Sequence, residues 1–229
     1  MRRIKLVIFD LDGTLVDSLG EIVAAINHVH DVFRLPHLTE NNIREILGSG
    51  RRLVDTLFQD AKKAERERAQ ELYLSYSDTN LLKSLRTYPR VAETLAELKH
   101  DGVLMAVISN KHSRLSGKIL SRLGMDSYFS DIIGPDSLPF CKPSPGPVFK
   151  LLRDLSVDTC DGIVVGDSIS DIQAGKNAGV VTVGCSYGYG SPSGLAYADY
   201  RIASMPELLK LPLFHENLRL KNPEHRIIV

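Results

Sequence analysis

The chain has 229 residues, enough for one large domain or for a domain with a smaller companion. Its 28 basic and 28 acidic residues give a formal net charge of zero, which argues against a nucleic-acid-binding or membrane-surface protein. No apolar stretch reaches transmembrane length. The three cysteines lack metal-site spacing and indicate a reducing compartment, so we expect a cytoplasmic protein without disulfides.

A short apolar run near the start of the chain ends in two aspartates. Residues 4–9 carry large and β-branched apolar side chains, which is typical of a buried strand in a parallel sheet. Asp10 and Asp12 follow two residues apart, so an extended backbone directs both side chains the same way. Two carboxylates there repel each other unless a cation lies between them. The pattern predicts a site for a hard metal ion and a reaction on an anion.

The next segment, roughly residues 17–83, shows helical patterns and no convincing strand. Ser18 and Glu21 have the spacing of a capping box at the start of the first helix, which ends before Pro36. Three further helices are predicted to begin near Thr39, Arg51 and Lys62. The segment is therefore predicted to be an all-helical insertion.

From Tyr88 onward, strand and helix patterns alternate, which is typical of a doubly wound parallel sheet. Strands are predicted at residues 103–108, 129–133, 162–166, 180–183 and 201–203. Helices are predicted at residues 91–98, 113–123, 144–155 and 168–178, with a last one opening at 204–207. The tail after Leu213 is polar and weakly patterned, and its structure is left open.

Polar side chains follow three of the predicted strands. They are Asp10 and Asp12, then Ser109 and Asn110, then Asp167. In doubly wound folds the functional site lies outside the carboxyl ends of the strands. We therefore expect these residues to meet at one edge of the sheet.

Four motifs in this order and spacing resemble those of the haloacid dehalogenase-like phosphatase superfamily. They are Asp10-Leu11-Asp12-Gly13-Thr14, then Ser109 after an apolar strand, Lys142-Pro143, and Gly166-Asp167-Ser168-Ile169-Ser170-Asp171. The resemblance covers nearly the whole chain. It implies a Rossmann-like α/β core, residues 1–16 and 84–229, with an inserted all-helical cap domain, residues 17–83.

The resemblance also implies a Mg²⁺-dependent phosphatase that forms an aspartyl-phosphate. Asp10 would be the nucleophile, and Asp12 would protonate the leaving oxygen and later deprotonate water. Mg²⁺ would be held by Asp10, by the backbone carbonyl of Asp12 and by Asp167.

Other residues of the motifs would hold the phosphoryl group. Ser109, Asn110 and Lys142 would contact its oxygens, and Asp171 would orient Lys142 or a water of the metal site. Alternatives stay open, because Ser109 and Asp171 could cap helices, and Asn110 and Lys111 could be ordinary loop residues.

Further stretches are similar to the phosphoglycolate phosphatases within this superfamily, at residues 109–111, 140–145, 171–175 and 187–190. They imply a small phosphorylated metabolite, 2-phosphoglycolate, as the substrate of a monomer or homodimer. A phosphomutase of the β-phosphoglucomutase type, a pyrophosphatase and a non-catalytic phospho-ligand-binding protein remain alternatives. Arg51, in a loop that would face the site, would grip the substrate carboxylate, although a solvated helix face is the competing interpretation.

Overall fold

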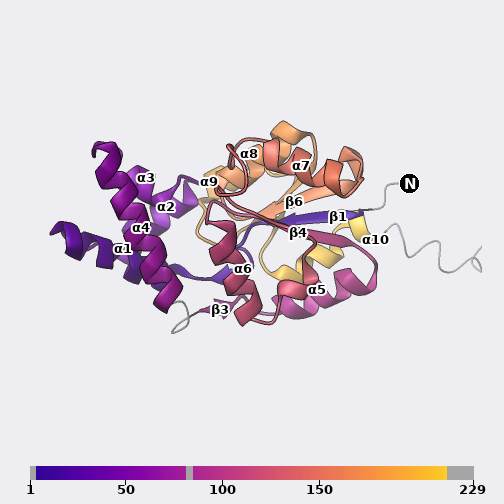
Figure 1. Ribbon diagram of the computed structural model, residues 1–229. Helices are drawn as coiled ribbons and strands as arrows, with labels where there is room; N and C mark the ends of the chain where they lie inside the picture. Colours follow the sequence, from indigo (N-terminus) through magenta and orange to yellow (C-terminus); the bar gives the residue numbers. More distant parts are fainter. Residues whose placement is uncertain (1–3, 81–84, 216–229) are drawn as a thin grey trace, which may run out of the picture.

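A computed structural model describes residues 4–80 and 85–215 (Figure 1). A sheet flanked by helices forms one end of the molecule, and four helices from the first third of the chain form the other (Figure 1). Among the described residues, no helix is long and apolar enough to cross a membrane. The cytoplasmic location and the oligomeric state stay predictions.

Six strands form the main sheet in the order β5-β4-β1-β6-β7-β8, and every neighbouring pair is parallel. They are β5 (Ile132–Ile133), β4 (Leu104–Ile108), β1 (Leu6–Phe9), β6 (Gly162–Gly166), β7 (Val181–Cys185) and β8 (Tyr200–Ile202). This confirms the doubly wound parallel sheet. The chain leaves β1 for β4 on one side and later returns to β6 on the other, so the crevice at the end of β1 is the expected binding position.

Helices cover both faces of the sheet because β1 is apolar on both sides. Val7 and Phe9 pack in one core cluster with α5 (Val91–His100) and α6 (Ser113–Arg122). Leu6 and Ile8 pack in a second cluster with α7 (Gly146–Asp154) and α8 (Ile169–Ala178). These two helices lie on the opposite side of the sheet from α5 and α6 (Figure 1). Because successive side chains of β1 enter opposite layers, the strand is packed on both sides. Asp10, the residue after Phe9, is therefore held in a fixed position between the two layers.

The remaining elements of the core are short. They are the 3₁₀ turns Asp126–Tyr128, Thr159–Asp161 and Met205–Lys210, and the helices α9 (Pro192–Leu195) and α10 (Pro212–His215). Two predictions were too generous here. The strand expected at residues 129–133 covers only Ile132–Ile133, because a 3₁₀ turn precedes it, and the helix expected from residue 204 is itself a 3₁₀ turn.

Four helices form the helical segment, with a hydrophobic cluster of their own. They are α1 (Leu19–Phe33), α2 (Glu40–Gly48), α3 (Leu53–Leu57) and α4 (Lys63–Asn80). Two short strands lie where the chain passes between the core and the helical segment, β2 (Val16–Asp17) and β3 (Arg86–Thr87), and they pair antiparallel. Asp17 therefore lies in a strand that was not predicted, since two residues carry no readable periodicity. The predicted domain boundary at residues 83 and 84 touches residues outside the described part.

The predicted capping box at the start of α1 is wrong. Ser18 is the N-cap residue, but its side chain makes no capping hydrogen bond. Its hydroxyl instead donates to Oδ1 of Asp12 at 2.5 Å. In a capping box the hydroxyl oxygen would accept from a backbone N–H, whereas here the hydroxyl donates to a carboxylate. Hydrogen bonds to a carboxylate are stronger than those between neutral groups, so this one sets the orientation of the Ser18 side chain.

Candidate active site

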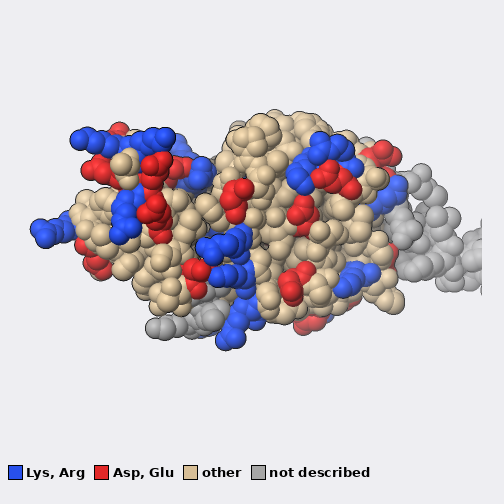
Figure 2. Space-filling model, in the orientation of Figure 1, with Lys and Arg blue, Asp and Glu red and all other residues tan. Residues whose placement is uncertain are grey.

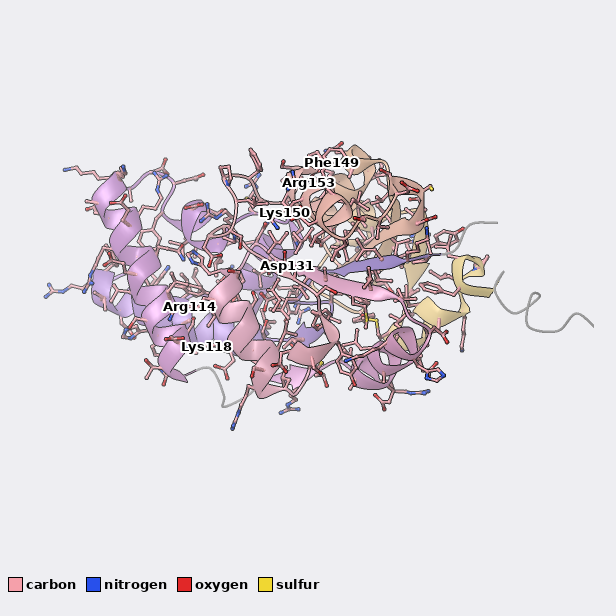
Figure 3. All side chains as sticks on the ribbon, turned by 45° about the vertical axis from the view of Figure 1, so that its right-hand side comes forward. Arg114, Lys118, Asp131, Phe149, Lys150 and Arg153 are labelled. Atoms are coloured by element: carbon pink, nitrogen blue, oxygen red, sulfur yellow. The ribbon has the colours of Figure 1, made fainter. Side chains whose placement is uncertain are left out.

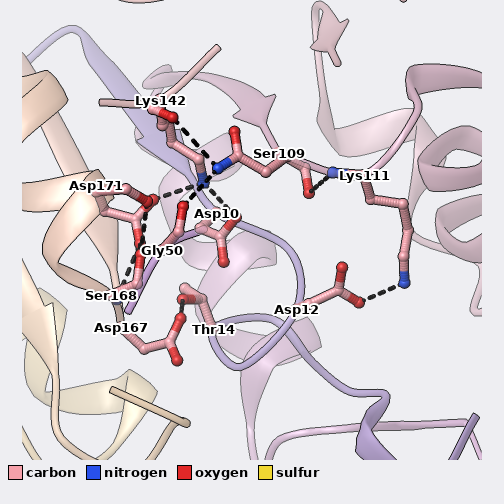
Figure 4. Close-up of polar contacts among 12 residues, drawn as sticks. Asp10, Asp12, Thr14, Gly50, Ser109, Lys111, Lys142, Asp167, Ser168 and Asp171 are labelled. Carbon is pink, nitrogen blue, oxygen red and sulfur yellow. Dashed lines mark hydrogen bonds and ion pairs between the residues drawn. The ribbon is translucent and has the colours of Figure 1, made fainter. Parts of the chain in front are cut away.

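The carboxyl ends of β1, β4 and β6 meet below the helical segment, as the fold rule predicts. A cavity of about 90 Å³ lies there. Its walls include Asp10, Asp12, Ser109, Asn110, Lys111, Lys142 and Asp167 from the core, and Ile22, Arg51, Leu53 and Tyr73 from the helical segment. The structure thus brings the residues of all four motifs together, although in the sequence they are spread from Asp10 to Asp171 (Figure 4).

Lys142 forms the centre of a buried ion-pair network. Its Nζ lies 2.5 Å from Oδ1 of Asp10 and 2.6 Å from Oδ1 of Asp171, and only 4% of its side chain is exposed (Figure 4). Burial by itself lowers the pKa of Lys142, but the two carboxylates outweigh it and raise the pKa well above its usual value. The ammonium is therefore charged, and it holds the Asp10 carboxylate in one place.

Asp171 performs both of the roles that the sequence left open. Its Oδ2 accepts hydrogen bonds from the backbone N–H and the hydroxyl of Ser168, at 3.0 and 2.6 Å, at the start of α8. Its Oδ1 accepts from Lys142. The capping interaction fixes the carboxylate on a rigid helix terminus, and the carboxylate in turn fixes Lys142.

Asp167, at the end of β6, is the third carboxylate of the cluster. It accepts hydrogen bonds from the Thr14 hydroxyl at 3.1 Å and from the backbone N–H of Tyr189 at 2.6 Å. Burial, with a further contribution from Asp171, raises its pKa to about 7. Burial also raises the pKa of Asp10 well above its usual range, against the opposing effect of Lys142. Both carboxylates are thus only partly neutralised by the positive charge around them.

A divalent cation would supply the positive charge that this carboxylate cluster lacks. Carboxylate oxygens of Asp10, Asp167 and Asp171 lie within 4.8 Å of one another. Three carboxylates and the single ammonium of Lys142 leave a formal charge of −2. Carboxylate oxygens are the ligands that Mg²⁺ prefers. The donor set and its charge are therefore suited to Mg²⁺, with Asp10 and Asp167 as the side chains available to it.

The carboxylate of Asp12 has different surroundings from that of Asp10. Its Oδ1 accepts from the Ser18 hydroxyl and from the Lys111 ammonium, at 2.5 and 2.7 Å (Figure 4). It lies outside the carboxylate cluster, which agrees with a metal contact through the backbone rather than the side chain. Different environments are what two neighbouring carboxylates need in order to perform different tasks.

The loop after β4 supplies the remaining polar groups. Ser109 is buried, and its hydroxyl oxygen accepts from the backbone N–H of Lys111 at 3.1 Å. The Asn110 amide donates to the carbonyls of Gly50 and Lys142, at 3.0 and 3.3 Å. Asn110 thus links the core to the helical segment, and its contact with phosphate stays a prediction. Arg51 is exposed beside the cavity, and its substrate contact stays a prediction too.

Tyr189 is a site residue that sequence reasoning missed. Its backbone N–H contacts Asp167, while its hydroxyl accepts from the Ser18 N–H at 2.9 Å and donates to Asp17 at 3.2 Å. The Arg44 guanidinium lies 5.3 Å from the centre of its ring. The glycine-rich stretch at residues 187–190 was the available signal, because a Cβ at Gly190 would collide with the Asp167 carbonyl.

Comparison with known proteins agrees with this geometry. Residues 7–185 match the model of the haloacid dehalogenase-like hydrolases. The chain belongs to this family. Curated relatives named phosphoglycolate phosphatase, from Vibrio parahaemolyticus and Neisseria meningitidis, are 34% and 35% identical to it. These alignments cover 91% and 98% of this chain, and 96% and 98% of the relatives.

Solved structures of haloacid dehalogenase-like hydrolases have the same fold. A crystal structure from Haemophilus somnus, described as a predicted phosphoglycolate phosphatase, superposes with a TM-score of 0.82 at 34% identity. It covers 92% of this hydrolase, which in turn covers 98% of that chain. A Bacteroides fragilis protein of the same hydrolase class gives a TM-score of 0.82 at 23% identity, and that likeness shows the fold alone.

Proposed function

We propose that this hydrolase is a Mg²⁺-dependent phosphatase whose substrate is 2-phosphoglycolate. The observation that carries the proposal is the buried Asp10, held by Lys142 beside Asp167 in a cluster with a formal charge of −2. Burying such a cluster costs free energy of folding, so its presence indicates a functional role. The names of the relatives support phosphoglycolate as the substrate.

Asp10 would act as the nucleophile. Its carboxylate oxygen attacks phosphorus, the bond to the bridging ester oxygen breaks, and Asp12 gives that oxygen a proton. Lys142 and the Ser109 hydroxyl would donate hydrogen bonds to the phosphoryl oxygens. Mg²⁺, held by Asp10, the Asp12 carbonyl and Asp167, would offset the repulsion between the anionic nucleophile and the phosphate.

The second half of the reaction regenerates the enzyme. Asp12, now a carboxylate, takes a proton from water while the water oxygen attacks phosphorus. The bond between phosphorus and the Asp10 oxygen breaks, and inorganic phosphate leaves. The cavity covered by the helical segment would limit access of other water molecules during this step.

The dimensions of the cavity support a small substrate. Its volume is about 90 Å³, and a small cavity favours a small phosphorylated substrate. Arg51 beside the cavity is the sequence-based candidate for the substrate carboxylate.

A phosphatase assay with Mg²⁺ and a panel of phosphomonoesters tests the proposal, with Asp10→Asn as the matched inactive variant. We expect 2-phosphoglycolate to be hydrolysed with the highest kcat/KM, and Asp10→Asn to lose at least about 1,000-fold in kcat. The variant should stay folded, because the amide has the shape of the carboxylate without its buried charge. Hydrolysis of no ester in the panel, or full activity of Asp10→Asn, would contradict the proposal.

A further inference from the structure

Two buried lysines line the cavity, and the proposed phosphoryl chemistry uses only one of them. Lys142 pairs with the nucleophile Asp10. Lys111 extends from the end of β4 to Asp12, on the opposite side of Asp10 from Asp171 (Figure 4). Its side chain is 8% exposed. Burying a charged group costs free energy, so an ammonium at this position calls for an explanation.

Asp12 satisfies only part of the hydrogen-bonding capacity of Lys111. An ammonium group has three N–H donors, and the Asp12 carboxylate takes one of them at 2.7 Å. Within the described part of the chain, Asp12 is the only hydrogen-bond acceptor of Lys111 Nζ. Lys111 also lines the cavity, together with Tyr73 from α4 above it. Unused donors of a buried cation thus border the space that the substrate would occupy.

We propose that the Lys111 ammonium binds the carboxylate of the substrate and so selects 2-phospho-carboxylates over other small phosphomonoesters. The inference rests on the proposed function, because it concerns the leaving group of that reaction. It assigns to a core lysine the contact that the sequence suggested for the exposed Arg51.

Covalent geometry supports this assignment. Asp12 contacts the bridging ester oxygen when it gives that oxygen a proton. In 2-phosphoglycolate the carboxylate carbon is two bonds from the bridging oxygen. A group within hydrogen-bonding distance of Asp12 is therefore also within reach of that carboxylate, and Lys111 meets this condition.

The charges fit the same assignment. The Asp12 carboxylate accepts from one of the three donors of the buried Lys111 ammonium, and the substrate carboxylate would accept from the donors that remain. An ester without a carboxylate, such as 2-hydroxyethyl phosphate, leaves these remaining donors without an acceptor from the substrate, which costs binding free energy.

The test compares 2-phosphoglycolate with 2-hydroxyethyl phosphate, which has a similar size and no carboxylate. For Lys111→Met we expect kcat/KM for 2-phosphoglycolate to fall by about 10- to 100-fold more than for 2-hydroxyethyl phosphate, the value of a charged hydrogen bond. The loss should appear mainly in KM, and Lys111→Arg should recover part of the preference.

A matched control is Lys150→Met. Lys150 lies on α7 and pairs with Asp131 and Asp154 at 3.3 and 2.7 Å (Figure 3). It is not among the residues that line the cavity. This variant removes a partly exposed ammonium from the same α/β domain. It should keep the ratio of kcat/KM for 2-phosphoglycolate to kcat/KM for 2-hydroxyethyl phosphate. Should Lys111→Met fail to fold, Lys111→Gln keeps a hydrogen-bond donor without the charge and answers the same question.

The outcomes separate the inference from the proposed function. An equal loss for both substrates in Lys111→Met would mean that Lys111 acts only through Asp12, and would overturn the inference. So would a selective loss in Arg51→Ala with none in Lys111→Met, or a wild-type enzyme that hydrolyses both esters equally well. In each of these cases the phosphatase assignment stands, although equal hydrolysis of both esters would also contradict the preference for 2-phosphoglycolate in the proposed function. A wild-type enzyme that hydrolyses neither ester overturns both.

Discussion

The edge of the sheet and the outer surface of the helical segment use charged residues in opposite ways. At the sheet edge, the Lys142 side chain is 4% exposed and lies between two carboxylates. On α4, the side chains of Lys63 and Glu67 are 89% and 63% exposed and lie 3.7 Å apart. Figure 2 shows basic and acidic side chains interleaved over the helical end of the molecule.

The difference teaches where charge carries chemistry in this protein. An exposed pair is solvated with or without its partner, so its contribution to stability is small. A buried pair is held rigidly, and each member depends on the other for its charge. Rigid, mutually dependent charges can shift pKa values and position a nucleophile, whereas solvated charges keep the surface soluble.

The largest expected effect is the loss of stability when a buried lysine is removed, compared with the removal of an exposed one. Lys142→Met leaves Asp10 and Asp171 buried without their ammonium, and we expect unfolding free energy to fall by about 3–5 kcal/mol. Lys63→Met should leave the unfolding midpoint unchanged. Urea unfolding of both variants measures the contrast. Equal stability of the two would mean that the buried network does not depend on Lys142.

Metal binding should affect only the sheet edge. Because the Asp10, Asp167 and Asp171 cluster carries a formal charge of −2, Mg²⁺ at 100 times its dissociation constant should raise stability by about 2.7 kcal/mol. Thermal unfolding with Mg²⁺ and with a chelator measures this shift, and chelation should also abolish phosphatase activity. The matched variant Asp167→Asn should lose most of the shift. An unchanged shift in that variant would place the ion elsewhere.

The smallest effect is expected at Asp136, whose partly exposed carboxylate caps α6. It accepts from the N–H and hydroxyl of Ser113, at 2.6 and 2.9 Å. Asp136→Ala should cost about 1 kcal/mol at neutral pH, as loss of an N-terminal cap does. Partial burial raises the pKa of Asp136, but these hydrogen bonds outweigh it, and the pKa is lowered from 3.8.

The pH dependence of that effect has a definite sign. A carboxylate with a lowered pKa in the folded state stabilises the fold above its unfolded pKa of 3.8. The stabilisation is lost as the pH falls through the folded pKa. The difference in unfolding midpoint between the wild type and Asp136→Ala should therefore shrink in acid. A difference that is constant with pH would show that the charge of Asp136 has no part in the cap.

Much of the candidate site was predictable because its signals are local. An apolar run that ends in Asp10, Ser109 or Asp167 can be read from neighbouring residues, and parallel sheet topology brings such ends to one edge. Lys142 could be predicted as a site residue only from the family resemblance, because a lysine before a proline in a loop has no local signature of burial.

The sequence by itself thus determined the strands of the main sheet, most of the helices and the identity of the motif residues. Only the tertiary structure decided which charged and polar groups pair. Asp12 and Lys111 are 99 residues apart, and Ser18 and Tyr189 are 171 apart. Even the Ser18 hydroxyl, expected to cap α1, donates at 2.5 Å to Asp12, a carboxylate six residues earlier in the turn after β1. Periodicity arises from contacts within a few residues, whereas a partner for a buried charge is chosen by packing across the whole chain.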